Sequence, residues 1–153
     1  MISKEIKNCI DQSVLCWLAT SNRENEPNVS PKEMFTLYSE STLLIANIAS
    51  PITVKNIELN PKVCVSILDI FVQKGYKIKG IAKIVEKTDN HFETKLKVLT
   101  DLFTDKFPII SIIEVEIQQV DKIVAPSYFL FPNTTAESQI ACAMKTYKVK
   151  PSE

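Results

Sequence analysis

The chain has 153 residues, of which 45% are hydrophobic and 24% charged, with 18 basic and 18 acidic side chains. This composition is typical of a folded globular domain and excludes disordered and low-complexity classes. The balanced charge gives no sign of the clustered basic surface on which nucleic-acid binding depends. Arg23 is the only arginine, so any bound anion must be held by lysine, hydroxyl and backbone N–H groups. We therefore expect a single domain over residues 1–153 that binds no nucleic acid.

Targeting and metal-binding signals are missing from the sequence. No segment approaches the roughly 18–20 apolar residues of a membrane-spanning helix, and residues 1–5 lack the apolar run of a signal peptide. We expect no metal site, because the cysteines form no C-x-x-C pair and the single histidine, His91, is remote from them. Buried free thiols in a reducing cytoplasm are the plainer interpretation. The four cysteines are Cys9, Cys16, Cys64 and Cys142.

The predicted elements begin with a short amphipathic helix over residues 3–12, followed by runs of strand character separated by polar turns. In order, the expected strands are residues 14–20, 28–38, 42–49, 63–70, 76–85, 109–120 and 123–131. The second run is interrupted by Ser30-Pro31, which suggests a sheet edge or a bulge, and the last is weakened by Pro126. Longer helical periodicity covers residues 88–106, and a final helix is expected from Thr134, with Glu137 completing a capping box.

Residues 76–85 show the clearest alternation in the chain. Tyr76 and Ile78 fall on one face with other apolar side chains, while Lys77 and Lys79 fall on the opposite face, as a strand with one solvated face requires. Six or seven short strands with few intervening helices are typical of a barrel or sandwich rather than a parallel α/β sheet. The sequence predicts a mainly β barrel of six to seven strands with short peripheral helices.

The most informative segment for chemistry is a predicted short helix between Ser50 and Asn60. Ser50 is a good N-cap, and Pro51 suits the first helical position. A helix N-terminus presents free N–H groups and partial positive charge, which favour a phosphate, and Thr53 and Lys55 add a hydroxyl and an ammonium. The alternative is an ordinary capped helix with solvated polar groups, which is the commoner case.

Two further segments are weaker candidates. Residues 29–34 combine Pro31 with Lys32, a pattern that also fits an edge strand whose lysine is simply solvated. Residues 74–80 hold both glycines of the chain, which indicate either a close ligand or a bulge that the barrel itself needs. Two glycines so placed cannot supply a P-loop, a G-x-G-x-x-G fingerprint or a nucleophile elbow, so a hydrolase is not expected.

The order of these segments resembles the pyridoxamine 5′-phosphate oxidase-like family, whose members share an FMN-binding split barrel. The resemblance covers residues 14–86 and is closest to small uncharacterised flavin-nucleotide-binding members of the family. It implies a split β-barrel, a homodimer, and two FMN sites at the subunit interface. The segments that carry it are residues 16–20, 27–33, 48–51, 53–56, 60–61 and 74–80.

The resemblance also assigns expected roles to individual residues. The FMN phosphate would be held by Ser50, Thr53 and Lys55, with Val54 and Asn56 beside them. Other contacts would come from the second and third strands, and from a partner-subunit strand over Gly75, Tyr76 and Lys77. The residues expected along the ribityl chain and the flavin ring are Ser30, Pro31, Lys32, Glu33, Asn47, Ile48 and Ala49.

Two departures from the family pattern limit the expected function. The Arg-Lys pair of the true oxidases stands here as Val54-Lys55, and residues 144–153 contain no arginine to hold pyridoxal phosphate. We therefore expect an FMN-dependent oxidoreductase acting on another small molecule, rather than pyridoxamine 5′-phosphate oxidation. The alternatives are a flavin-binding module for storage or sensing without turnover, and a barrel that binds no flavin.

Overall fold

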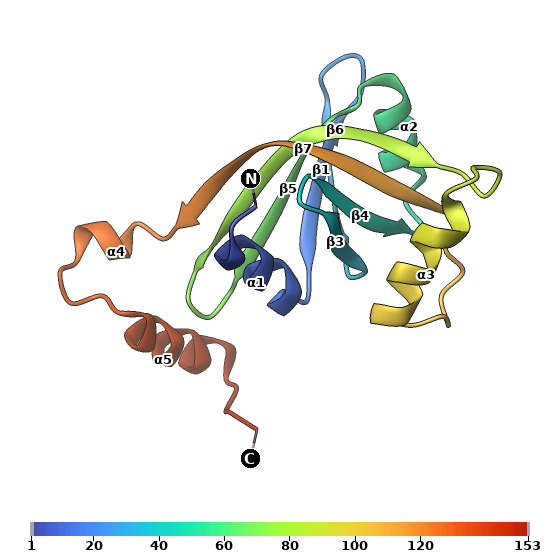
Figure 1. Cartoon of the computed structure of the whole chain (residues 1–153). Coiled ribbons are helices and arrows are strands. Elements are labelled where there is room, and N and C mark those ends of the chain that lie inside the picture. Colours follow the sequence, from blue (N-terminus) through green and yellow to red (C-terminus); the bar gives the residue numbers. More distant parts are fainter. Residues whose placement is uncertain (1, 153) are drawn as a thin grey trace.

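Seven antiparallel strands form one open sheet in the structure, a computed structural model that describes residues 2–152 (Figure 1). The strand order is β2-β1-β5-β6-β7-β4-β3, so the two edges of the sheet are β2 and β3. The mainly β, split-barrel prediction is confirmed. The strands are β1 (Cys16–Ser21), β2 (Pro27–Lys32), β3 (Phe35–Ser39), β4 (Thr42–Asn47), β5 (Lys62–Asp69), β6 (Lys74–Val85) and β7 (Ser111–Val124).

Five short helices surround the sheet in the described part of the chain. The helix α1 lies across one side of the barrel and α2 at its far end, whereas α3 packs beside β3, β4 and β7 (Figure 1). None of the helices within residues 2–152 is long and apolar enough to cross a membrane. The helices are α1 (Lys4–Gln12), α2 (Pro51–Leu59), α3 (Phe92–Leu102), α4 (Ser127–Leu130) and α5 (Ala136–Tyr147).

The prediction of one strand over residues 28–38 was wrong. This segment forms two strands, β2 and β3, which lie at opposite edges of the sheet. The break falls at Glu33–Met34, after the strand β2, and not at Ser30–Pro31. Pro31 lies within β2, which is an edge strand, and an edge position tolerates its missing N–H. The chain therefore crosses from one sheet edge to the other over two residues.

The C-terminal elements also differ from the prediction. The two runs over residues 109–131 contain one long strand, β7, and then the short helix α4, which follows Pro126. A proline suits a helix start because it has no N–H to lose there. The last helix is capped by Thr135 and Ser138, which exchange hydrogen bonds of 3.2 and 2.9 Å, rather than by Thr134 and Glu137.

The strand β6 confirms the predicted alternation and explains both glycines. Ile78 is buried, while Lys77 and Lys79 are exposed. A Cβ at Gly75 would overlap the carbonyl oxygen of Ile67, and one at Gly80 would overlap that of Glu116. Both glycines therefore permit close approach of neighbouring strands, and the register shifts between β6 and β7 next to Gly80.

The buried apolar side chains form two cores. The larger lies inside the barrel, where Ile6 and Ile10 of α1 and Ile57 of α2 close it. The smaller packs Phe92 and Leu99 of α3 against the sheet. Burial of this kind stabilises the fold by roughly 1.5–3 kcal/mol for each large side chain. The helices α1 and α2 thus close the two ends of the barrel, and the two candidate sites described below lie beside them.

The four cysteines are free, as expected, but only one of them is fully buried. Cys16 is fully buried, Cys9 and Cys64 are half-buried, and Cys142 is exposed on α5. Cys142 is exposed because α5 lies beside the barrel and not over it (Figure 1). Within residues 2–152, no three His, Cys, Asp or Glu side chains are grouped so that they could hold a metal.

Candidate functional site

A row of polar side chains lines the inner face of the edge strand β2. Asn28, Ser30 and Lys32 alternate with the exposed Val29 and Pro31. Alternate residues of a strand share one face. The three polar residues pair with Thr20, Leu18 and Cys16 of β1, which are buried. The polar row therefore faces inward and toward the start of α2.

The row is joined to the first turn of α2 by direct hydrogen bonds. The Ser30 and Thr53 hydroxyl oxygens are 3.1 Å apart, and Asn28 Nδ2 donates to Thr53 Oγ1 at 3.4 Å. Lys32 Nζ donates to Ser50 Oγ at 2.5 Å. These five residues, Asn28, Ser30, Lys32, Ser50 and Thr53, are referred to below as the polar cradle.

Lys32 is the only cation of the polar cradle, and it is nearly fully buried, with 6% of its surface exposed. Among the described residues, no carboxylate forms an ion pair with Lys32. Burial lowers the pKa of its ammonium, and the nearby Cys16 acts in the opposite direction. The pKa of Cys16 is itself raised to about 12 by burial. A buried ammonium without a counter-charge is costly unless an anion neutralises it.

The turn from β4 into α2 is fixed by Asn47. Its Oδ1 accepts a hydrogen bond from Ser50 N at 3.2 Å, and its Nδ2 donates to Ser111 Oγ at 2.9 Å. Ser50 is the N-cap residue of α2, but its side chain makes no capping hydrogen bond because it accepts from Lys32 instead. The first-turn N–H groups of α2 are therefore not capped by this hydroxyl, and they add partial positive charge beside Lys32.

Asn56 anchors α2 rather than pointing at the polar cradle. It is buried, and its Nδ2 donates to Thr20 Oγ1 at 3.1 Å. Thr20 Oγ1 also accepts from Asn28 Nδ2 at 3.3 Å. The hydroxyl thus connects the helix to the polar row, so that β1, β2 and α2 are held together by one small network.

We expect Asn56→Ala to lower the free energy of unfolding by about 1–3 kcal/mol, because Thr20 would lose a buried partner. Asn60→Ala is the matched control, since Asn60 Nδ2 donates to Ser21 Oγ at 2.8 Å in a less buried position. We expect its loss to be below about 1 kcal/mol. Urea unfolding of both variants measures the difference. Equal losses would show that the Asn56 bond has no special role in holding α2.

The remaining predicted residues near α2 flank the polar cradle. Ile48 and Val54 are half-buried, whereas Pro31, Glu33, Ala49 and Lys55 are exposed. Lys55 is the central residue of α2, five residues after Ser50. The structure therefore brings Ser30 into contact with Thr53 and Lys32 into contact with Ser50, and it leaves Lys55 exposed on α2.

Gly75, Tyr76 and Lys77 lie at the other end of β6. Lys77 pairs with Ser66 and Asp121 there, whereas α2 meets the opposite end of the strand, where Ala82 N donates to the carbonyl of Pro61 at 2.8 Å. Within one chain the predicted site residues thus form two separate groups.

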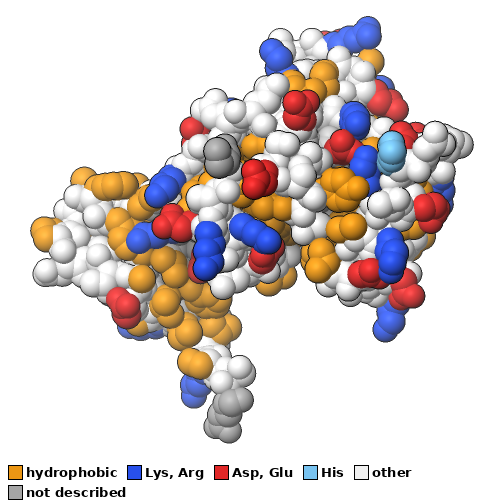
Figure 2. Space-filling view, in the orientation of Figure 1, with side chains coloured by type: hydrophobic (Ala, Val, Ile, Leu, Met, Phe, Trp, Pro, Cys, Tyr) orange, Lys and Arg blue, Asp and Glu red, His pale blue; other side chains and the backbone are white. Residues whose placement is uncertain are grey.

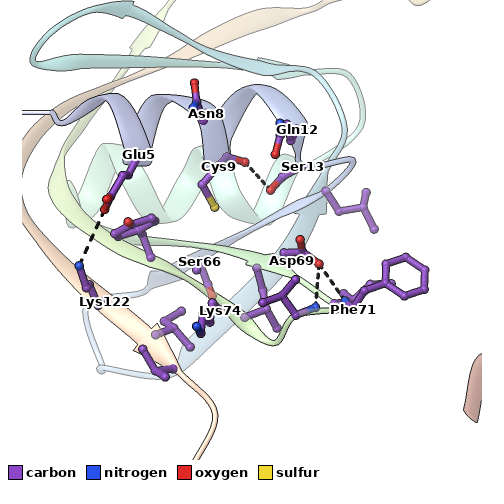
Figure 3. A pocket seen from close by; sticks show the side chains of 18 of the residues that line it. Glu5, Asn8, Cys9, Gln12, Ser13, Ser66, Asp69, Phe71, Lys74 and Lys122 are labelled. Atoms are coloured by element: carbon purple, nitrogen blue, oxygen red, sulfur yellow. Dashed lines mark hydrogen bonds and ion pairs between the residues drawn. The ribbon is translucent and has the colours of Figure 1, made fainter. Parts of the chain in front are cut away.

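The second group borders a large cavity of about 1050 Å³. The cavity lies between α1, the hairpin that joins β5 and β6, and the end of β7 (Figure 3). Tyr128 and Phe129 of α4 also line it. Gly75 and Tyr76 are the predicted site residues that line it. Asp69 Oδ1 shapes the hairpin by accepting from the N–H groups of Phe71 and Val72 at 2.9 and 3.0 Å.

The cavity wall is mainly apolar, with a few balanced charges. Glu5 and Lys122 form an ion pair of 3.9 Å at one side of the cavity (Figure 3). Lys74 Nζ lies 3.9 Å above the ring centre of Tyr128. Burial raises the pKa of Tyr76, with Glu5 adding to the effect. This cavity holds no unneutralised cation comparable with Lys32, so it is the poorer anion site of the two.

The sequence-based prediction missed Thr20, Asn28 and Ser111. The first two were detectable, because the polar turn after Ser21 sets the hairpin register, and counting back from it pairs Thr20 with Asn28 and Cys16 with Lys32. Ser111 was not detectable, since its contact with Asn47 spans the β4–β7 pairing, which no local pattern encodes.

Comparison with known proteins agrees with this architecture. HupZ of Group A Streptococcus has 22–23% sequence identity, and one of its structures superposes with a TM-score of 0.68 over 78% of this chain and 92% of that chain. An FMN-binding protein from Syntrophomonas wolfei gives 15% identity and a TM-score of 0.68, covering 80% of this chain and 86% of the other. HutZ, the heme storage protein of Vibrio cholerae, gives 17% identity and 0.65, covering 80% and 94%.

At these identities the structural matches establish the fold. A comparison with curated proteins found no match. The family assignment comes from the sequence itself, because the family model described as pyridoxamine 5′-phosphate oxidase matches residues 2–123, most of the chain. Together with the seven-stranded open sheet, this match shows that the chain belongs to the pyridoxamine 5′-phosphate oxidase family.

Proposed function

We propose that the chain binds FMN, with its phosphate in the polar cradle. The observation that carries the proposal is the buried ammonium of Lys32, which has no carboxylate partner among residues 2–152 and lies beside the N-terminus of α2. A phosphate dianion would neutralise this charge and accept from the hydroxyls of Ser30, Ser50 and Thr53 and from first-turn N–H groups. The donor set thus fits a phosphate without an arginine.

Family membership and the similarity to an FMN-binding protein support FMN as the ligand that carries this phosphate. We propose a homodimer in which β6 of the second subunit, at Gly75, Tyr76 and Lys77, completes the flavin site. The separation of the two predicted groups within one chain supports this arrangement. The four free thiols support a reducing cytoplasm as its compartment.

When bound, the flavin would supply hydride or electron transfer, and the chain would hold the phosphate, orient the ring and exclude water. We propose a flavin-dependent oxidoreductase whose substrate is a small molecule other than pyridoxamine 5′-phosphate. Storage or sensing without turnover is the second candidate. It is favoured by the polar cradle itself, whose members are hydroxyls, amides and Lys32, with no carboxylate or imidazole to act as acid or base.

A titration with FMN and riboflavin tests the proposal. The two ligands share the ring and differ in the phosphate, so we expect FMN to bind at least 100-fold more tightly if the polar cradle holds that group. The visible spectrum of the purified chain reports binding. Equal affinities would show that the polar cradle does not hold the phosphate. If neither FMN nor riboflavin binds, the flavin proposal is refuted. Reduction of the bound flavin by NADH or NADPH then separates an oxidoreductase from a storage module.

A further inference from the structure

The C-terminal arm, residues 125–152, projects from the barrel (Figure 1). It exposes large apolar side chains. Phe129, Leu130 and Phe131 are 77%, 69% and 63% exposed, and Tyr147 of α5 is 54% exposed. The arm begins where the family match ends, since residues 124–153 lie outside the matched segment. It therefore lies beyond the part of the chain that the family model matches, and its exposed apolar surface requires its own explanation.

The root of the arm is held firmly to the β5–β6 hairpin. Ala125 N donates to the carbonyl of Gln73 at 3.1 Å, and Tyr128 Oη donates to that of Val72 at 2.8 Å. Further along, the ring of Tyr147 packs edge-on against Phe71, with 6.2 Å between ring centres. These contacts hold the arm at the hairpin tip and direct it away from its own sheet.

A second apolar surface lies next to the arm root. Val14, Leu15, Trp17 and Ile70 line the large cavity and are 81%, 37%, 46% and 48% exposed. We call these four residues the cavity rim. In Figure 2 hydrophobic side chains gather on the side of the molecule where Figure 1 places α4 and α5. The charges within the cavity are balanced, with Glu5 beside Lys122, so an apolar occupant meets no net charge.

The combined area is the size that a stable dimer needs. Large apolar side chains present roughly 150–250 Å² each when fully open, so the cavity rim and the arm together expose on the order of 1,000 Å², against about 800 Å² per partner in a standard interface. A patch of this size is rarely left in water by a monomer. Because both surfaces belong to one chain, two copies can cover each other about a twofold axis.

We infer that the C-terminal arm of one copy lies on the cavity rim of a second copy, so that the two chains exchange arms. Phe131 of each arm then becomes buried against the cavity rim of the other chain, and Phe129, which also lines the cavity of its own chain, loses its remaining exposure. This goes beyond the homodimer proposed above, because it names the element that forms it. It predicts that dimerisation survives without flavin.

The test compares full-length, flavin-free variants by sedimentation. Phe129→Ser with Phe131→Ser should raise the dimer dissociation constant by roughly 100-fold or more, since exposed aromatic anchors would be lost from both arms. Leu102→Ser with Phe107→Ser is the matched control, because these side chains are 60% and 48% exposed near the end of α3 and should leave the dimer intact. Both pairs are exposed, so neither double variant should unfold.

Trp17, the single tryptophan, reports where the arm lies. Its emission should shift to shorter wavelength as the wild-type chain dimerises, and the shift should be absent from the Phe129/Phe131 variant. A wild-type chain that sediments as one copy overturns both the arm exchange and the homodimer. An arm variant that remains a dimer, or a dimer in which Trp17 emission is unchanged, overturns the arm exchange alone. Flavin titration tests the polar cradle independently of each result.

Discussion

Lys32→Met should weaken FMN binding by roughly 10- to 150-fold, the loss expected for one charged hydrogen bond of about 1.5–3 kcal/mol. Lys32 is buried and donates to Ser50, so its ammonium is already positioned beside the start of α2 before a ligand arrives. Methionine has a similar length and no charge, and it removes a buried ammonium that burial disfavours. We therefore expect the variant to fold at least as stably as the wild type, and isothermal titration with FMN to show the loss.

Lys55→Met is the natural comparison, because Lys55 is exposed on the same helix. Solvent weakens an exposed ion pair to about 1 kcal/mol or less, so we expect at most roughly a fivefold loss. Riboflavin affinity should be unchanged in both variants. If Lys55→Met costs more than Lys32→Met, the phosphate lies at the helix surface and the polar cradle is not its site.

The same residue gives a pH dependence with a defined sign. Burial lowers the pKa of Lys32 in the free protein, whereas a bound phosphate would favour the charged ammonium and raise that pKa. FMN affinity should therefore be constant between the second pKa of the phosphate, about 6, and the lowered pKa of Lys32, and should fall as the pH rises through the latter. In the Lys32→Met variant, FMN affinity should not fall in this way at high pH. An affinity in the wild type that does not fall on the alkaline side would contradict a Lys32–phosphate contact.

Gly80→Ala should lower the free energy of unfolding by about 3 kcal/mol, because the added methyl group meets backbone rather than a flexible side chain. The new Cβ would overlap the Glu116 carbonyl oxygen and come within 2.7 Å of Val115 Cγ1. Relief requires the longest strand pair of the sheet, β6 with β7, to separate next to its register shift. Chemical denaturation of the purified variant measures the loss.

Lys79→Ala is the control for Gly80→Ala. Lys79 is the preceding residue, and its ammonium forms an exposed pair with Asp121 at 3.6 Å. We expect a change within about 0.5 kcal/mol, as for most surface substitutions. If Gly80→Ala lowers the free energy of unfolding equally little, β6 and β7 can move apart freely, and the glycine is not needed for their close approach.

Most of the barrel could be predicted from local patterns. The alternation of Ile78 with Lys77 and Lys79 showed which face of β6 is buried, and Ile6 and Ile10 located α1. The prediction was wrong where tertiary context decides. Pro31 suggested a break, but an edge strand accepts it, and the real break at Glu33–Met34 carries no strong breaker residue.

The candidate site was predictable in composition and less so in geometry. Ser50 and Thr53 were predicted from the sequence at the start of one helix, and Ser30 entered the site through the family resemblance. The contact between Ser30 and Thr53 joins β2 to α2, which no local pattern encodes. The burial of Lys32 could not be read from the sequence, because it depends on α2 covering an edge strand. Whether these residues contact FMN stays a prediction. The exposed arm also escaped prediction, since α5 has an ordinary amphipathic pattern whose partner surface local sequence does not reveal.

The open seam of the barrel has a kinetic consequence for whatever enters the polar cradle. Since β2 and β3 are the two edges of one sheet, no ladder of hydrogen bonds joins them in the described structure. The edge strand β2 can therefore move outward at the Glu33–Met34 corner while the β1–β5–β6–β7 ladder stays closed. Local openings of this kind have smaller free energies than global unfolding. Backbone amides of β2 should accordingly exchange with solvent deuterium faster than those of β6, and ligand entry would proceed without disturbing the core.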